Sequence, residues 1–187
     1  TGAYPIDTMG MGGRKDKLPN LYPPGFANPG DALWQQGPKF SGLVGMLDDQ
    51  HDALSMALLR NVVTDVNTDN PAQIAAAQRA IQQLIKTANL KFDTNEYQHL
   101  ADGSLWLHQA CSGDVAATPL YAPKGTKASA FAYWWPANGH RPINHATLAV
   151  VRGAKNPVPP QPVPTHAPNL RPPTPHPLPR PGYCRPR

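Results

Sequence analysis

The chain has 187 residues, of which 24 are proline and only 16% are charged, and its formal net charge is +5. This length suits one ordinary domain with extensions. No apolar stretch of about 18 residues occurs, which argues against a transmembrane helix, and neither a collagen period nor a long heptad array is present.

Charge is divided unevenly along the chain. Residues 1–114 carry all 12 acidic residues and 8 Lys or Arg residues, whereas residues 115–187 carry 9 Lys or Arg residues and no acid. This asymmetry predicts a basic surface in the C-terminal half that faces an acidic or polyanionic partner. Nucleic acid is one such partner, but no nucleic-acid recognition motif supports it.

Residues 1–39 are predicted to form an extended arm. Glycine and proline recur through them, and both residue types oppose a persistent helix or central strand. Aromatic side chains at Tyr22, Phe26 and Trp34 stand between them. We expect these side chains either to anchor the arm in grooves of a neighbouring chain or to wrap the core of this protein.

Residues 40–156 are predicted to form the folded body. From residue 43 to residue 66, apolar side chains recur at helical spacing. A second helix is expected after Asn70, a favourable N-cap that is followed by Pro71 and by an apolar stripe as far as residue 88. The short polar link between the two segments predicts an antiparallel helical hairpin.

The rest of the body is expected to be short and partly extended. Residues 93–112 fit either a short helix or two irregular turns. Residues 129–135 and 143–151 predict two strands of a β-hairpin that packs on the helical pair. Trp134 and Trp135 would point to opposite faces of their strand, so we expect one of them to pack into the core and the other to meet solvent or a partner. A purely internal role for both rings is the alternative. The predicted fold class is α+β, a small body flanked by long Pro-rich extended arms.

Residues 157–187 are predicted to be a proline-rich tail. They contain 13 prolines among 31 residues, which favours polyproline II with a reach of roughly 90 Å. Because such a segment loses little entropy on docking, we expect Arg171, Arg180 and Tyr183 to contact a partner chain. A disordered spacer is the alternative.

Two cysteines leave the compartment open. A disulfide between Cys111 and Cys184 in an oxidising compartment would close a loop of roughly 70 residues and stabilise the fold by about 4 kcal/mol. In a reducing cytosol the two residues would be unrelated thiols. The start at Thr1 without a signal peptide fits either case, and we favour a virion or an extracellular or periplasmic location over the free cytosol.

Cys111 and His145 are the weak catalytic candidates. Residues 143–150 (INHATLAV) resemble the histidine strand of papain-like cysteine peptidases, and residues 110–113 (ACSG) are similar to the nucleophile turn of NlpC/P60-type cell-wall peptidases. The resemblance implies a thiolate that the imidazole activates. The two residues are much closer in sequence than the roughly 130–150 residues of papain-like enzymes, and no clear orienting group follows His145. No histidine pair has metal-binding spacing, so neither a metal nor a cofactor is predicted.

The architecture as a whole predicts a non-catalytic structural or accessory subunit. Its extended arms would attach it to the other protein subunits of a large assembly, such as a virion, a surface appendage or an envelope complex. An accessory subunit of a secreted or periplasmic enzyme complex is the first alternative. A cysteine hydrolase that uses Cys111 and His145 is the second.

Overall fold

The computed structural model describes residues 2–18, 30–134, 142–148 and 152–153. Its contacts divide the chain into two units. The smaller unit contains Thr1–Asp7 and Ile143–Arg187, and the larger unit is Thr8–Pro142. The helices of the described residues are α1 (Gly30–Gln36), α2 (Gln50–Arg60), α3 (Pro71–Ala88), α4 (Glu96–Asp102) and α5 (Ser112–Tyr121), with short 3-10 turns at Gly37–Phe40 and Ala128–Ala130.

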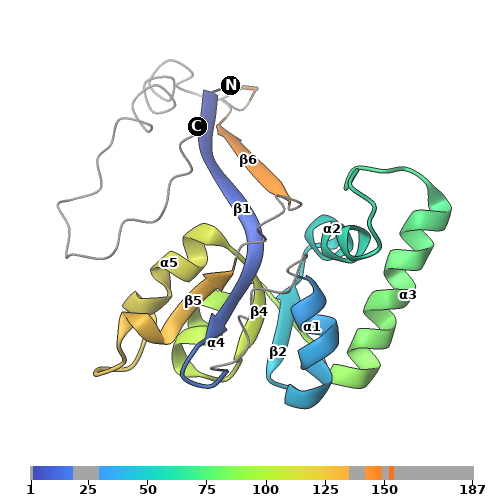
Figure 1. Cartoon of the computed structure of the whole chain (residues 1–187). Coiled ribbons are helices and arrows are strands. Elements are labelled where there is room, and N and C mark those ends of the chain that lie inside the picture. Colours follow the sequence, from blue (N-terminus) through green and yellow to red (C-terminus); the bar gives the residue numbers. More distant parts are fainter. Residues whose placement is uncertain (1, 19–29, 135–141, 149–151, 154–187) are drawn as a thin grey trace. The chain divides into compact units, whose positions relative to one another are not determined.

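The strands belong to one mixed sheet. They are β1 (Gly2–Arg14), β2 (Val44–Leu47), β3 (Lys91–Asp93), β4 (Leu107–Cys111), β5 (Phe131–Trp134) and β6 (Ile143–Leu148). The order is β3-β2-β4-β1-β5, and β6 also pairs with β1 (Figure 1). Strand β2 is parallel to β3 and β4, whereas β1 is antiparallel to β4 and β5. Helices α2 and α3 lead from β2 to β3, and α4 leads from β3 to β4, as parallel neighbours require.

The mixed class agrees in part with the predicted α+β fold, but the N-terminal residues behave differently. Met9 and Met11 of β1 are fully buried in the main core. On the alternate positions, a Cβ at Gly10 would collide with Tyr133, and one at Gly12 would collide with Val115 and Leu100. Glycine therefore lets neighbouring side chains pack against the strand. The expectation that residues 1–39 form neither helix nor central strand is wrong, since both β1 and α1 lie there.

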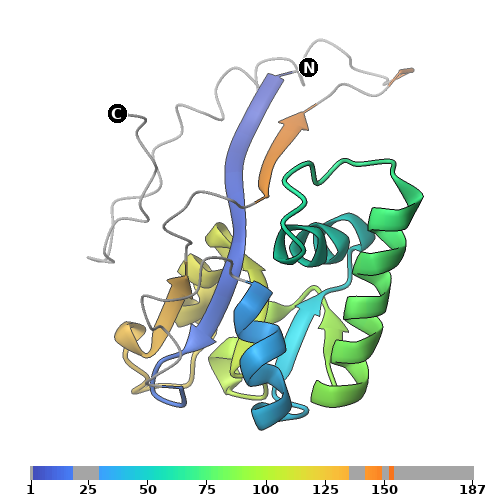
Figure 2. The ribbon, with the colours of Figure 1, turned by 45° about the vertical axis from the view of Figure 1, so that its right-hand side comes forward.

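The second predicted helix is confirmed as α3. The side chain of Asn70 accepts hydrogen bonds from the N–H groups of Ala72 and Gln73, at 3.0 and 3.4 Å. The buried stripe of Ala77, Ile81, Leu84 and Ala88 belongs to the main core. Figure 2 shows α1, α2 and α3 grouped beside β2.

The first predicted helix is wrong in its N-terminal part. All four residues of β2 are buried, so Val44–Leu47 is the short apolar run of a central parallel strand rather than one face of a helix. Helix α2 begins only after Asp49, whose side chain accepts a hydrogen bond from the N–H of Asp52 at 3.0 Å. It ends at Arg60, and Val62 has a left-handed φ of 62°.

The predicted β-hairpin is also corrected. Its two strands exist as β5 and β6, but each pairs with β1. For residues 93–112 the sequence predicted either a short helix or two irregular turns; they contain the short helix α4 and, in addition, the strand β4. The predicted tail, residues 157–187, lies outside the described residues, so its polyproline II conformation stays a prediction.

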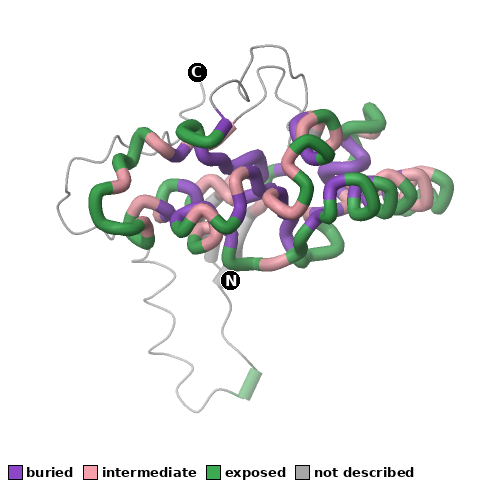
Figure 3. The backbone as a smooth tube through the Cα atoms, turned by 90° about the horizontal axis from the view of Figure 1, so that it is seen from below, coloured by how far each residue is buried: buried purple, intermediate pink, exposed green. Residues whose placement is uncertain are grey.

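Burial follows this arrangement. Figure 3 shows buried residues along the inner strands and exposed residues on the outer turns of the helices. Within the described residues, no helix combines the length and the apolar character that crossing a bilayer needs.

Candidate functional site

The carboxyl ends of the parallel strands form the first candidate site. Strand β3 lies on one side of β2 and β4 lies on the other, so the order reverses between β2 and β4. Ligands of open α/β sheets bind outside the carboxyl ends of the strands at such a point. We call residues 48–52, 93–96 and 111–114, which follow or end β2, β3 and β4, the carboxyl edge.

A buried glutamine holds two parts of this edge together. Gln109 of β4 has no exposed surface. Its Oε1 accepts a hydrogen bond from the N–H of Leu47 at 3.4 Å, and its Nε2 donates one to the carbonyl oxygen of Asp52 at 2.8 Å. The end of β2 and the first turn of α2 are therefore fixed against β4.

Two carboxyl groups and a thiol converge at the edge. Ligand atoms of Glu96, Cys111 and Asp114 lie within 4.8 Å of one another. Glu96 is only 1% exposed. Its burial, followed by the nearby carboxylates of Asp114 and Asp93, raises its pKa to about 7. Near neutral pH this carboxyl group therefore exchanges a proton readily, and a bound cation would favour its ionised form.

Asp93 stands between two imidazoles. Its Oδ2 lies 3.6 Å from Nε2 of His108 and 3.8 Å from Nε2 of His99, and its Oδ1 accepts a hydrogen bond from the N–H of Asn95 at 2.7 Å. Burial alone would raise the pKa of Asp93, but its contacts with His108, Asn95 and His99 outweigh burial and lower it. Asp93 therefore stays ionised and negatively charged near neutral pH.

The charge of the carboxyl edge would favour a cation. Residues 48–52, 93–96 and 111–114 contain six acidic residues and no Lys or Arg. Carboxylates attract organic amines through charge-assisted hydrogen bonds. The combination of one thiol and two carboxyl groups at Glu96, Cys111 and Asp114 could also hold a divalent metal such as Zn²⁺.

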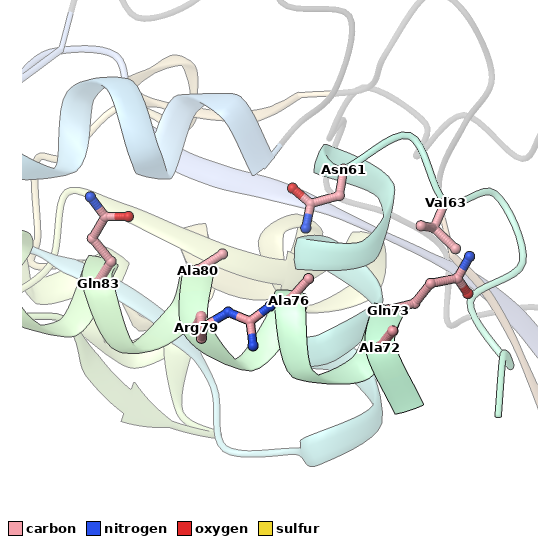
Figure 4. Close-up of a pocket in the computed structure, with 8 residues that line it drawn as sticks. All are labelled: Asn61, Val63, Ala72, Gln73, Ala76, Arg79, Ala80 and Gln83. Carbon is pink, nitrogen blue, oxygen red and sulfur yellow. The ribbon is translucent and has the colours of Figure 1, made fainter. Parts of the chain in front are cut away.

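Two hollows of the larger unit lie away from this edge. One, of about 590 Å³, lies where the end of α2 faces α3 (Figure 4), and it is lined by Asn61, Val63, Ala72, Gln73, Ala76, Arg79, Ala80 and Gln83. The other, of about 640 Å³, is rich in lysine and lies where β1 ends and β5 begins. Neither hollow is lined by a residue of the carboxyl edge.

The structure describes only some of the residues that the sequence singled out. Cys111 ends β4 and is half-buried. His145 lies in β6 of the other unit, and its side chain is outside the described part. Trp34 packs against the core and donates its indole N–H to the carbonyl oxygen of Ala80 at 3.1 Å, and Trp134 also packs against the core. Residues outside the described part are Tyr22, Phe26, Trp135, Arg171, Arg180, Tyr183 and Cys184.

Sequence analysis missed the acidic residues of the carboxyl edge. Asp93, Glu96 and Asp114 are spread over more than twenty positions, and the topology alone brings them together. The available signal was positional. Each acidic residue comes at or just after a short stretch that the sheet uses as a strand, and this placement is typical of binding residues in α/β proteins.

Comparison with solved structures gives the fold. A lipoprotein of Treponema pallidum, TpPotD, matches with a TM-score of 0.66 and 19% identity over 83% of this chain and 45% of its own. The spermidine/putrescine ABC transporter substrate-binding protein PotD of Streptococcus pneumoniae matches at 0.58 and 12%, over 76% and 40%. An ABC transporter substrate-binding protein of Bradyrhizobium japonicum matches at 0.53 and 16%, over 70% and 38%. The chain has the fold of a substrate-binding protein domain.

The likeness has clear bounds. The chain spans less than half the length of these three proteins. No family model matches it, and no curated protein matches it by sequence.

This fold overturns the predicted role. The hypothesis of a structural or accessory subunit of a virion, surface appendage or envelope complex is wrong, because the matched structures are transporter substrate-binding proteins. Its two alternatives, an accessory subunit of an enzyme complex and a cysteine hydrolase, do not match this class either. An extracellular or periplasmic location remains compatible with these neighbours, one of which is a lipoprotein.

Proposed function

We propose that this chain binds a cationic solute at the carboxyl edge and works with an ABC transporter. The observation that carries the proposal is the convergence of Asp93, Glu96 and Asp114 beside the point where the strand order reverses. That position is where open α/β sheets bind their ligands. The names of two neighbours in the same fold class refer to spermidine and putrescine, which are organic polyamines.

The electrostatics favour a ligand with amino groups. Asp93 stays ionised, and Glu96 is poised near neutral pH, so an ammonium group that arrives would favour ionisation of both carboxyl groups. An anionic solute would meet the six acidic residues of the edge and no Lys or Arg. The ligand is therefore expected to carry at least one positive charge.

The proposed partner and compartment follow from the proposed binding of a solute. A solute-binding lobe would deliver its ligand to the permease of an ABC transporter on the outer side of the cytoplasmic membrane. The fold class of the neighbours supports this assignment.

Titration of the chain with spermidine and putrescine, followed by amide chemical shifts, tests the proposal. This measurement detects weak as well as tight binding. We expect shifts at residues 93–96 and 111–114, and none with a neutral diol of the same length. Asp114→Asn is expected to weaken binding about tenfold, because it removes one charge-assisted hydrogen bond. Absence of shifts with both amines would overturn the proposed solute class.

Asp69→Asn is the matched control. Asp69 is an exposed acid in the loop before α3 and is not among residues 93–96 and 111–114, so the variant makes the same change of charge at another position. It is expected to bind as the unaltered chain does. An equal loss in both variants would mean that net charge, rather than this site, attracts the amine.

A divalent metal is the second candidate ligand, favoured by the thiol of Cys111 beside two carboxyl groups. Addition of Cd²⁺ to the reduced protein would then produce the ultraviolet charge-transfer band of a metal thiolate. Cys111→Ser should remove that band. If the band is absent and the amine shifts are present, the site binds amines and not metal.

A further inference from the structure

A basic hollow lies at the other end of the strands from the carboxyl edge. Arg14, the last residue of β1, pairs with Phe131, the first residue of β5. Residues 14–16, 124–127 and 129–130 line a hollow of about 640 Å³ there. All of these residues belong to the unit Thr8–Pro142.

The one acid in the lining is already neutralised. Nε and Nη2 of Arg14 donate to the two carboxylate oxygens of Asp16 at 2.8 and 2.7 Å. Nη1 of the same guanidinium donates to the carbonyl oxygens of Leu100 and Ala101, at 3.1 and 3.2 Å. Arg14 is therefore a structural residue that cancels the charge of Asp16, and the positive charge of the hollow comes from lysine.

Three lysines supply that charge. Lys15, Lys124 and Lys127 line the hollow and are exposed. None of them takes part in the ion pairs found among the described residues. The hydroxyl-bearing residues Thr126 and Ser129 line the same hollow, so neutral donors stand beside the cations.

The backbone holds these groups in place. The N–H of Lys15 donates to the carbonyl oxygen of Ala130 at 2.7 Å, which ties the segment after β1 to the segment before β5. The N–H groups of Thr126 and Ala130 donate to the carbonyl oxygens of Pro123 and Lys127, at 3.0 and 2.9 Å. The three lysines are thus presented by two connected turns.

We propose that this hollow binds a phosphate group. Lysine binds phosphate as a point charge, and a phosphate has enough oxygen atoms to accept hydrogen bonds from several ammonium and hydroxyl groups together. Three positive charges that form no ion pair with the described residues match a multiply charged oxyanion better than a single carboxylate. The proposal concerns a different end of the molecule from the solute site and does not depend on it.

Two arms of one experiment distinguish a soluble phosphate from a lipid headgroup. In the first arm, calorimetric titration of the full chain uses pyrophosphate, with citrate as a trivalent carboxylate anion for comparison. In the second, sedimentation uses phosphatidylcholine vesicles with and without phosphatidylglycerol. Binding of pyrophosphate alone indicates a soluble ligand, and binding to the phosphatidylglycerol vesicles indicates a headgroup. Binding of pyrophosphate and binding to the vesicles should both weaken at high salt, because salt screens the exposed lysines.

Charge-matched variants locate the site. Lys124→Ala with Lys127→Ala is expected to weaken binding about 10- to 30-fold, from the typical contribution of one lysine near an anionic surface. Lys86→Ala with Lys91→Ala removes the same charge from exposed positions outside the hollow and should change affinity less than about twofold. Ser129→Ala keeps the charge and tests the hydroxyl group.

Three outcomes would overturn the proposal. They are no binding in either arm, citrate binding as tight as pyrophosphate binding, and equal loss in the two double variants. Equally tight binding of citrate would mean that the hollow attracts anions in general rather than phosphate. Equal loss of affinity in the two double variants would mean that net charge, rather than this hollow, causes the binding.

Discussion

Gly45 of β2 lies directly against the imidazole of His108 on the neighbouring strand β4, and a Cβ at Gly45 would overlap that ring. His108 has no exposed surface, and its Nε2 points to the carboxylate of Asp93 across the width of β2. The missing side chain at one position therefore lets a buried histidine reach the carboxyl edge. This relationship connects the packing of the sheet to the charge of the candidate site.

Gly45→Ala is expected to destabilise the protein by about 2 kcal/mol, because the ring of His108 or the backbone of β2 must move in a close-packed interior. Urea denaturation gives the free energy of unfolding. Gly113→Ala is the control, since a Cβ there meets no atom within 4 Å. If both variants unfold at the same urea concentration, the contact between Gly45 and His108 does not constrain the sheet.

Glu96 is expected to make stability depend on pH. Since its pKa rises from 4.5 to about 7 in the folded protein, the folded state holds a proton that the unfolded chain releases above about pH 4.5. The free energy of unfolding should therefore be highest below pH 4.5 as far as Glu96 is concerned, and should fall as pH rises through about 7. The loss is up to about 3 kcal/mol.

Urea denaturation at a series of pH values between 4.5 and 8 measures this effect. Glu96→Gln keeps the shape of the side chain but cannot titrate, so the fall in the free energy of unfolding with rising pH should disappear. Asp69→Asn should keep the profile of the unaltered chain. A profile for Glu96→Gln that follows the unaltered chain would show that another group causes the dependence.

Gln109→Leu tests whether Gln109 holds the end of β2 and the first turn of α2 against β4. The substitution removes the hydrogen bonds that the side chain of Gln109 makes with the N–H of Leu47 and with the carbonyl oxygen of Asp52. We expect a loss of about 2 kcal/mol in the free energy of unfolding. We also expect faster hydrogen exchange at the start of α2 than in α3. Equal protection of both helices would mean that Gln109 does not position the edge.

Asn70→Ala tests the start of α3. Its side chain caps the N–H groups of Ala72 and Gln73, so its removal should cost about 1 kcal/mol of stability. Asp69→Ala, at the preceding exposed position, should change stability by less than about 0.5 kcal/mol. Thermal unfolding followed by circular dichroism compares the two variants.

Helix α3 shows what the sequence could predict. Asn70, Pro71 and the apolar stripe up to Ala88 act within a few turns, so local spacing is enough to identify the helix. The apolar run of β2 was misread because a short buried strand and a helix face share the same residue types, and only the neighbours β3 and β4 decide between them.

The candidate site shows the limit of local reasoning. Residue types suggested Cys111, but not that its thiol would lie beside Glu96 and Asp114. The positive charge of residues 115–187 was evident in the sequence, whereas the meeting of two of its lysines, Lys124 and Lys127, with Lys15 around one hollow requires the approach of β1 to β5. Such contacts depend on strand order, which is fixed by long-range pairing.

The sequence by itself therefore determined the helix at residues 71–88, the strand character of residues 131–134 and the charge difference between the halves, because each depends on neighbouring residues. Only the tertiary structure decided that β1 lies between β4 and β5. The hydroxyl of Tyr133 donates to the carbonyl oxygen of Thr8 at 2.6 Å, across 125 positions of sequence. Contacts over such distances are stabilised by the whole sheet, and no local pattern records them.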